Sequence, residues 1–315
     1  MKQFLSVNDI PDVDALVKEG LSLKHSPFSY QNLGKNKTLG MIFFNPSLRT
    51  RLSTQKAALN LGMSVIVMNI NQEGWQIEFE DGAVMNGDKQ EHIKEAVAVV
   101  SQYCDVLGVR TFANLSDREK DYREEVLHKF IQYSSVPVIS LESATKHPLQ
   151  SLADLLMIEE HKKAAKPKVV LTWAPHPRAL PQAVPNSFVE WMKRANVDLT
   201  VAFPEGYALE SSLLEGVHVT HDQDAAFKGA DFIYAKNWSS YQEYGKILSK
   251  DTSWTVTQEK MNLTNQGKFM HCLPVRRNVV VADGVLDSPA SLIETQATNR
   301  IYAAQIVLKK ILESL

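Results

Sequence analysis

The sequence lacks several features that mark large classes of protein. Its 315 residues include only two cysteines, Cys104 and Cys272, which form no CxxC pair. This predicts neither a disulfide framework nor a structural zinc site. No apolar run approaches the roughly 18 residues that would cross a bilayer. The acidic first fourteen residues do not resemble a signal peptide. We therefore expect no membrane partner and a cytoplasmic location.

The sequence also lacks a surplus of charge of either sign. Lys and Arg total 34 and Asp and Glu total 36, for a formal net charge of −2. A general nucleic-acid binder would show a basic excess, so we expect no nucleic-acid partner. The length suits about two domains of ordinary size.

Sequence motifs of several enzyme classes are absent as well. No GxG occurs, so the dinucleotide-binding fingerprint is missing, and neither HExxH nor GxSxG is present. The nearest approach to a phosphate-binding P-loop runs from Gly82 to Gly87, but Asp88 follows where that motif needs lysine. These absences argue against dehydrogenases, P-loop NTPases, zinc proteases and serine esterases. We expect no metal and no cofactor.

Short β-rich runs alternate with helical patterns along the chain, which is typical of parallel α/β proteins. Strands are expected at residues 38–44, 64–69, 106–109, 136–140, 168–174, 198–203, 217–220, 231–235 and 268–272. Helices are expected at residues 50–61, 91–103, 148–163 and 289–315. Gly62 should end the first of these helices. The pattern predicts two successive α/β units.

The segment Ser47–Arg51 lies between a predicted strand and a predicted helix. Backbone N–H groups at the start of a helix, with the hydroxyls of Ser47 and Thr50, can cradle a phosphate. The Arg49 guanidinium can add a bidentate contact. The alternative is an ordinary N-cap with two surface arginines. Two cations in a first helical turn oppose the helix dipole, however, and a bound anion would remove that conflict.

Three further polar motifs also follow predicted strands. Arg110 ends one strand, His147–Gln150 opens a helix after another, and His271–Pro274 closes a third. Alone, His147–Pro148 fits a simple helix start and Cys272 a small buried hydrophobe. Ligands of open α/β sheets bind at the carboxyl ends of the strands, so the shared placement predicts ligand contacts.

Together with Asn299–Arg300, these motifs resemble the aspartate/ornithine transcarbamylase family over the length of the chain and in the family's order. The resemblance implies two doubly wound parallel-sheet α/β domains. Residues 1–140 would bind carbamoyl phosphate, residues 141–288 would bind the amino acid, and the helix 289–315 would pack back on the first domain. It also implies a homotrimer with shared active sites.

The resemblance further assigns roles to individual residues. Carbamoyl phosphate would be contacted by Ser47, Leu48, Arg49, Thr50, Trp75, Arg110, His147, Gln150, Cys272, Leu273 and Arg300. Within this set, the catalytic residues would be Arg49, Arg110, His147 and Cys272. Gln150 would meet the carbamoyl amide, and Trp75 would reach a neighbouring subunit's site. The physics fits, because prearranged cations and N–H donors stabilise the negative charge that develops on an attacked carbonyl. Phosphate leaves readily, so no covalent nucleophile is needed.

A proline-rich loop, residues 173–185, follows the first strand of the second unit. The alternative is a rigid surface loop with a purely structural role. With the run 271–278, the loop resembles the branch of the family that acts on N-acetyl- or N-succinylornithine. The Asp-x-x-Ser-Met-Gly loop of plain ornithine enzymes is absent. By this resemblance, the acylornithine would be contacted by Gln90, Glu142, His176, Lys236 and Arg276.

Charge distinguishes the two candidate acyl groups, succinyl and acetyl. The resemblance aligns Gln90 with a glutamate of the acetyl type and a proline of the succinyl type, and it aligns Val280 with a lysine of the acetyl type. A carboxylate at position 90 would repel the second carboxylate of a succinyl group, whereas an amide can donate a hydrogen bond to it. A cationic surround of His176, Lys236 and Arg276 also suits a dicarboxylated substrate. We therefore favour N-succinylornithine, with N-acetylornithine and then plain ornithine as alternatives.

Two other functions would use the same anion cradle. A phosphoryl-transfer enzyme would need Mg²⁺-binding carboxylates near Ser47, and no suitable acidic pair is present. A non-catalytic relative would have no chemical need for Arg49, Arg110, His147 and Cys272 together. From the sequence we expect Arg110→Ala to lose activity with little loss of stability.

Overall fold

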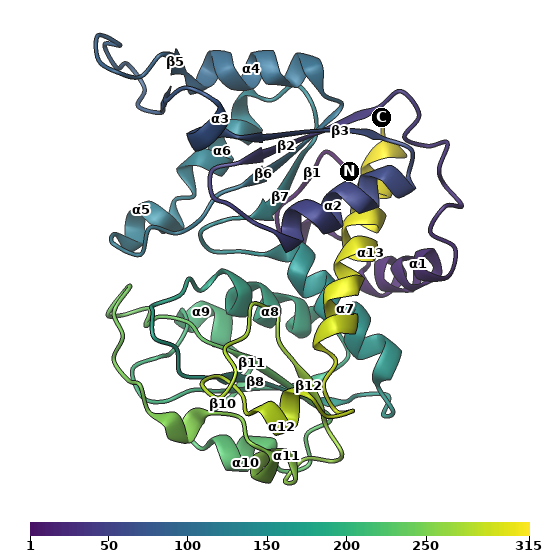
Figure 1. Ribbon diagram of the computed structural model, residues 1–315, viewed down its shortest axis with the longest axis vertical. Helices are drawn as coiled ribbons and strands as arrows, with labels where there is room; N and C mark the ends of the chain where they lie inside the picture. The colour runs from purple at the N-terminus through teal and green to yellow at the C-terminus, as the bar shows by residue number, and fades with distance from the viewer. The chain divides into compact units, whose positions relative to one another are not determined.

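The computed structural model describes residues 1–315, apart from the side chain of Asn71. The chain forms two compact units (Figure 1). The first unit comprises Met1–Ala113, Glu119–Leu149 and Arg300–Leu315, and the second comprises Asn114–Arg118 and Gln150–Asn299. Among the described residues, none of the helices combines the length and apolar composition needed to cross a membrane.

A five-stranded parallel sheet forms the centre of the first unit, in the order β1-β7-β6-β2-β3. Its strands are β1 (Gln3–Phe4), β2 (Thr38–Phe43), β3 (Ser64–Asn69), β6 (Val106–Arg110) and β7 (Val138–Glu142). Strands β6 and β7 are buried along their whole length, as expected for a parallel sheet covered on both faces. The order of the strands reverses between β2 and β6, and a separate parallel pair is formed by β4 (Ile77–Glu78) and β5 (Glu91–His92).

Helices cover both faces of this sheet (Figure 1). The helices with residues in this unit are α1 (Val13–His25), α2 (Arg49–Asn60), α3 (Ile70–Glu73), α4 (Ile93–Tyr103), α5 (Arg118–Tyr122), α6 (Glu125–Tyr133) and the C-terminal part of α13 (Ile293–Leu312), with a 3-10 turn η1 (Val7–Asp9). The buried Lys309 of α13 is ion-paired with Glu19 of α1 and Glu313. This network ties the end of the chain to α1.

The second unit contains another five-stranded parallel sheet, in the order β10-β9-β8-β11-β12. Its strands are β8 (Lys168–Trp173), β9 (Asp198–Ala202), β10 (His218–Thr220), β11 (Phe232–Lys236) and β12 (Lys268–Met270). Its order reverses between β8 and β11. Figure 1 shows α8 and α9 on one face and α10 and α11 on the other. Its helices are α7 (Pro148–His161), α8 (Ala183–Arg194), α9 (Ser211–Leu214), α10 (Gln223–Phe227), α11 (Gln258–Met261) and α12 (Asp283–Leu286), with a 3-10 turn η2 (Thr252–Trp254).

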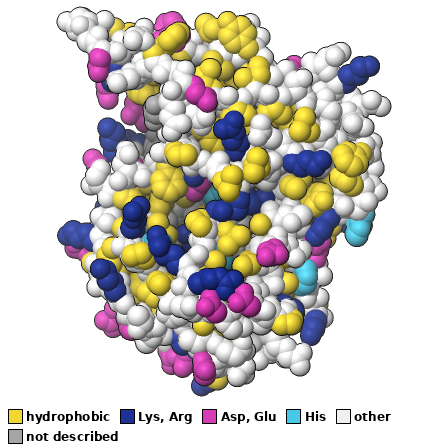
Figure 2. All heavy atoms as spheres, viewed as in Figure 1, with side chains coloured by type: hydrophobic (Ala, Val, Ile, Leu, Met, Phe, Trp, Pro, Cys, Tyr) yellow, Lys and Arg dark blue, Asp and Glu magenta, His cyan; other side chains and the backbone are white. Residues whose placement is uncertain are grey.

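The predicted fold class is confirmed, because both sheets are parallel and flanked by helices. All the predicted strands are present, and none of their ends is shifted by more than two residues. Gly62 ends α2 as predicted, with φ of +82°. A side chain there would collide with the backbone, since its Cβ would lie 2.0 Å from the carbonyl oxygen of Gln31. On the face shown in Figure 2, basic and acidic side chains are interspersed, in keeping with the balanced composition.

Three predicted element boundaries are wrong, each for a local reason. The helix expected from residue 91 begins at Ile93, because residues 91–92 pair with β4. The final helix begins at Ile293 rather than 289, because Ser291 lies beside Phe269 of β12 as an extended segment. The proline-rich loop ends at Gln182, because Pro185 lies in the first turn of α8, where its missing N–H is not needed.

Candidate active site

Several predicted site residues lie where each sheet reverses its strand order. In the first unit, Ser47–Thr50 follow β2, and Arg110 is the last residue of the adjacent β6. In the second unit, His176 follows β8, and Lys236 ends the adjacent β11. The carboxyl ends of strands at such a reversal form the usual ligand crevice of an open α/β sheet. The topology therefore supplies one ligand position per unit.

No side chain caps the start of α2. The helix begins at Arg49 with Leu48 as N-cap, and no side-chain cap hydrogen bond is present there. The ordinary N-cap interpretation of this segment, with a Ser or Thr hydroxyl as the cap, is therefore wrong. N–H groups in the first turn of a helix have no intrahelical acceptor, and with Arg49 and Arg51 in that turn they favour an anion.

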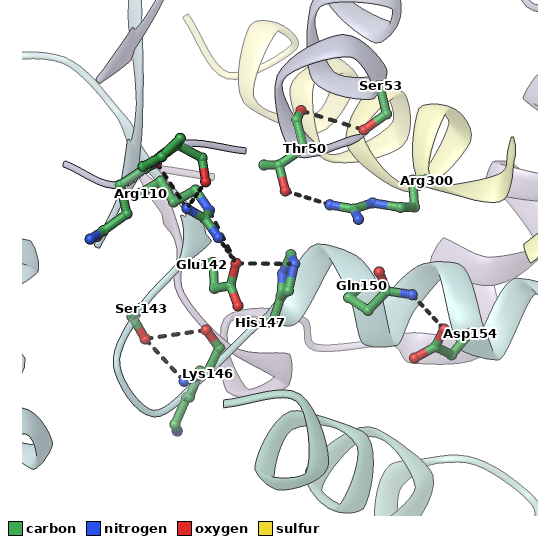
Figure 3. Close-up of polar contacts among 12 residues, drawn as sticks. Thr50, Ser53, Arg110, Glu142, Ser143, Lys146, His147, Gln150, Asp154 and Arg300 are labelled. Carbon is green, nitrogen blue, oxygen red and sulfur yellow. Dashed lines mark hydrogen bonds and ion pairs between the residues drawn. The ribbon is translucent and has the colours of Figure 1, made fainter. Parts of the chain in front are cut away.

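Arg110, Glu142 and His147 form a buried polar cluster in the first unit (Figure 3). Arg110 Nε and Nη2 donate to Glu142 Oε2 at 3.1 and 2.8 Å. His147 Nε2 lies 3.7 Å from the same oxygen. The cluster comes from the ends of β6 and β7 and from the residue before α7.

The Arg110 guanidinium is held mainly by the protein. Its Nη1 donates to the carbonyl oxygens of Asn45 and Pro46 at 2.8 and 2.9 Å. With the two bonds to Glu142, these use four of the five N–H donors of an arginine. Arg110 therefore offers a ligand its positive charge and one N–H in a rigidly fixed orientation.

Glu142 is ionised despite its burial. Burial alone would raise its pKa, but the charges of His147, Arg110 and Arg300 together with the Arg110 hydrogen bond outweigh it, and the pKa lies below its ordinary value. A carboxylate with this environment can hold an ammonium group, which is the role that the resemblance implies.

Thr50 and Arg300 meet beside the start of α2. Arg300 Nη2, from α13, donates to Thr50 Oγ1 at 2.6 Å, and both residues are buried (Figure 3). The contact joins residues 250 positions apart, so it explains how the C-terminal helix brings a cation to the cradle of the first unit.

The loop before His147 is held by a residue that the sequence interpretation missed. Glu124 has a left-handed backbone with φ of 46°, and its Oε1 accepts hydrogen bonds from the backbone N–H of Thr145 and from two hydroxyls. Lys146 N also donates to Ser143 Oγ at 3.0 Å. No local sequence pattern signals this role, because Glu124 lies about twenty residues away.

Trp75 and Gln90 lie on neighbouring segments of the first unit. Both side chains are exposed, and Trp75 Nε1 donates to Glu91 Oε2 at 2.7 Å. The backbone N–H of Gln90 donates to the carbonyl oxygen of Gln76 at 3.1 Å. The structure therefore places these two residues on adjoining, exposed segments.

A cationic pocket lies beside His176 in the second unit. Its volume is about 460 Å³, within the usual range of small-molecule sites. It is lined by Pro175, His176, Pro177, Lys250, Thr252, Val275, Arg276, Arg277 and Val279. Lys250 and Arg277 were not predicted, because they reach the pocket only through the tertiary fold. Arg277 is ion-paired with Asp283 and Asp287, whereas Lys250 is exposed.

His176 orients Arg276 within this pocket. Arg276 Nε donates to His176 Nε2 at 3.0 Å, and His176 Nδ1 lies 2.8 Å from the carbonyl oxygen and 3.1 Å from the backbone nitrogen of Arg178. Burial and the charges of Arg276, Lys236 and Arg178 lower the pKa of His176. The imidazole is therefore neutral near pH 7, and the two terminal nitrogens of Arg276 can face a carboxylate.

The remaining predicted residues lie elsewhere in the second unit. Gln150 is buried on α7, and Cys272 and Leu273 follow β12. Leu273 has a left-handed backbone with φ of 58°, and its N–H donates to His271 Nδ1 at 2.9 Å. Val280 is 2% exposed, so that position faces the core in this chain. Among the described residues, no three His, Cys, Asp or Glu side chains gather as a metal site.

Comparison with known proteins identifies the family. Residues 2–160 match the model of the aspartate/ornithine carbamoyltransferase carbamoyl-P binding domain, and residues 181–311 match that of the Asp/Orn binding domain. An N-succinylornithine carbamoyltransferase of Bacteroides thetaiotaomicron is 56% identical over all of both chains. An N-acetylornithine carbamoyltransferase of Xanthomonas axonopodis is 37% identical over 98% of this chain and 96% of its own.

A solved structure agrees with these relatives. It is an N-acetyl-L-ornithine transcarbamylase variant, with one glutamate replaced by proline, complexed with carbamyl phosphate and N-succinyl-L-norvaline. It matches with a TM-score of 0.93 and 36% identity, over 99% of this chain and 100% of that one. This chain therefore belongs to the aspartate/ornithine carbamoyltransferase family and is a carbamoyltransferase.

Proposed function

We propose that this enzyme transfers the carbamoyl group of carbamoyl phosphate to the δ-amino group of N-succinyl-L-ornithine, giving N-succinyl-L-citrulline and phosphate in arginine biosynthesis. The observation that carries the proposal is the 56% identity, over the full length of both chains, to an N-succinylornithine carbamoyltransferase. Identity to an N-acetylornithine carbamoyltransferase is lower, at 37%.

Carbamoyl phosphate binds the first unit in this proposal. Its phosphate would lie at the uncapped start of α2, against Ser47, Leu48, Arg49 and Thr50. The amine attacks the carbamoyl carbon, the bond from that carbon to the phosphate oxygen breaks, and the proton that the amine nitrogen loses passes to the departing phosphate or to solvent. Arg110, His147 and Arg300 are preorganised by buried contacts, so they can stabilise charge on the carbonyl oxygen without moving.

The acceptor binds the second unit in this proposal. The pocket beside His176 contains the cations Lys250 and Arg276, besides the Arg277 that is paired with Asp283 and Asp287, and Arg276 is aligned by the neutral imidazole. N-succinylornithine carries two carboxylates, whereas N-acetylornithine carries one, so a pocket with several cations favours the succinyl compound. Lys236, at the end of β11, adds positive charge at the same edge of the sheet. Glu142 would meet the ammonium end, and Cys272 and Leu273 would orient the attacking amine.

Gln90 supports the same choice. In the solved relative, replacement of a glutamate accompanies a complex with a succinylated ligand. The sequence resemblance aligns a glutamate of the acetyl type with the exposed, neutral Gln90 of this chain. A site without that negative charge does not repel the second carboxylate of a succinyl group.

The choice of amine tests the proposal directly. The protein is incubated with carbamoyl phosphate and, in turn, ornithine, N-acetylornithine or N-succinylornithine, and the ureido product is measured. We expect kcat/KM for N-succinylornithine to exceed that for N-acetylornithine at least tenfold, because an unmatched cationic pocket loses a charge-assisted contact. Product only from plain ornithine would contradict the acyl preference, and no product from any amine would contradict the transfer itself.

The same resemblance supports a homotrimer in which Trp75 completes a neighbouring subunit's site. Trp75 is 56% exposed, as a residue that contacts another subunit would be in a single chain. Light scattering should give three times the 35.4 kDa chain mass. Mixing inactive Trp75→Ala and Arg110→Ala subunits should restore part of the activity, because some shared sites then carry both native residues. A monomeric active enzyme, or no recovery after subunit exchange, would contradict this arrangement.

A further inference from the structure

A chain of buried hydrogen bonds runs behind Gln150 in the second unit. Gln150 Nε2 and Gln296 Nε2 both donate to Asp154 Oδ1, at 2.7 and 2.6 Å (Figure 3 shows the first). The other end of the Gln296 amide, Oε1, accepts the backbone N–H of His271 at 2.9 Å. None of these four residues is more than 3% exposed. The chain therefore links α7, α13 and the end of β12 without solvent.

Each bond in this chain fixes the direction of the next. A backbone N–H can only donate, so His271 requires the oxygen of the Gln296 amide. The nitrogen of that amide then faces residue 154, where the carboxyl oxygen Oδ1 accepts its hydrogen bond. The same Asp154 oxygen receives Gln150, so the Gln150 nitrogen is held inward and its oxygen points the other way.

The Gln150 oxygen is left as a buried acceptor. Gln150 Oε1 has no hydrogen-bond partner among the described residues. A buried acceptor without a partner is costly, so such a group in a native protein calls for a ligand or a water. The carbamoyl amide is a donor of two N–H bonds, which is the chemistry that this oxygen lacks.

We propose that Asp154 is a positioning residue that makes Gln150 select the amide of carbamoyl phosphate. Asp154 itself touches no substrate. It acts by presenting the oxygen rather than the nitrogen of Gln150 to the carbamoyl group, with its own orientation set by Gln296 and the His271 backbone. The inference rests on the proposed function, in which Gln150 meets the carbamoyl amide.

Acetyl phosphate tests this inference, because a methyl group replaces the NH₂ of carbamoyl phosphate at nearly the same size. The dissociation constants of both compounds are measured by calorimetry on the full chain. The wild type should bind carbamoyl phosphate roughly ten- to hundredfold more tightly than acetyl phosphate, since the methyl group leaves Oε1 unsatisfied. Asp154→Ala should bring this ratio close to that of Gln150→Leu, which defines the value without the acceptor.

The conservative variant distinguishes position from charge. Asp154→Asn should keep the wild-type ratio, because Gln296 still requires an oxygen at residue 154 and that oxygen still holds the Gln150 nitrogen. The double variant Asp154→Asn with Gln296→Leu removes that requirement and should lose the ratio. This double variant also serves if Asp154→Ala fails to fold. If Asp154 had a merely structural role, its loss would weaken the binding of carbamoyl phosphate and of acetyl phosphate equally and leave the ratio of their dissociation constants unchanged.

Asp231 provides the matched control. Its carboxylate also accepts two hydrogen bonds in the second unit, from the Lys168 backbone N–H and Asn265 Nδ2 at 2.8 and 3.1 Å, at the opposite ends of β8 and β11 from the predicted ligand position. Asp231→Ala should leave the ratio at the wild-type value. The inference would be overturned if folded Asp154→Ala kept the wild-type ratio of the two dissociation constants. It would also be overturned if Asp154→Asn reduced that ratio as much as Asp154→Ala does.

The same measurements separate this inference from the proposed function. A wild type that forms ureido product but binds the two phosphates equally would overturn the role of Gln150 and of Asp154 while the transfer stands. A wild type that forms no product would overturn the proposed function.

Discussion

Arg110→Ala is expected to lower kcat about 100- to 1,000-fold, the usual effect of removing one preorganised group that stabilises developing negative charge. It should also destabilise the protein. The substitution leaves Glu142 buried without its ion pair, and breaking a buried pair costs about 3–5 kcal/mol. Steady-state kinetics and urea unfolding measure the two effects separately.

A double variant separates the two roles of Arg110. Arg110→Met with Glu142→Met removes both buried charges, so much of the stability should return, because an apolar pair of similar volume replaces the ion pair. Activity should stay low, since neither charged group is present. Wild-type turnover in Arg110→Ala would contradict the site assignment. An unchanged free energy of unfolding in that variant would contradict the importance of the ion pair.

Gln90→Glu is expected to lower kcat/KM for N-succinylornithine about ten- to hundredfold, because the new carboxylate repels the second carboxylate of the succinyl group. The constant for N-acetylornithine should change less than about threefold, since that compound lacks the second charge at its acyl end. The two acceptors are compared at low salt, and the difference should shrink as salt screens the exposed residue.

The neutral Gln90→Leu variant is the control for this substitution. It removes the amide without adding charge, so it should reduce the constant for N-succinylornithine less than Gln90→Glu does. If Gln90→Glu lowered kcat/KM equally for both acceptors, position 90 would not distinguish the two acyl groups. Equal losses in Gln90→Leu and Gln90→Glu would show that charge is not the reason.

The strands were predictable because each is a short local pattern. Runs such as residues 168–174 are apolar and flanked by polar turns, and parallel strands buried on both faces keep this signal. The first residues of α8 and of α13 were harder to predict from the sequence. Pro185 is compatible with both a loop and a first helical turn, and the extended segment at Ser291 depends on its pairing with Phe269.

The role of Arg110 shows the limit of sequence reasoning about the site. Its place at the end of a strand was evident, but its ion pair with Glu142 joins two strands and cannot be read from either segment. This contact changes the expectation of little stability loss in Arg110→Ala, which was based on an arginine free for a ligand. Lys250 and Glu124 were missed for the same reason.

By itself, the sequence determined the α/β class, the order of the motifs along the chain and the resemblance to the carbamoyltransferases, because these depend on local pattern and residue type. Its near-neutral charge argued against a general nucleic-acid role but concealed the cations of the site. Only the tertiary structure decided that the start of α2 lacks a side-chain cap, that Glu142 pairs with Arg110, and that Asp154 holds the Gln150 amide in one orientation. Hydrogen bonds and ion pairs between distant residues depend on distances of a few ångströms, which residue order does not contain.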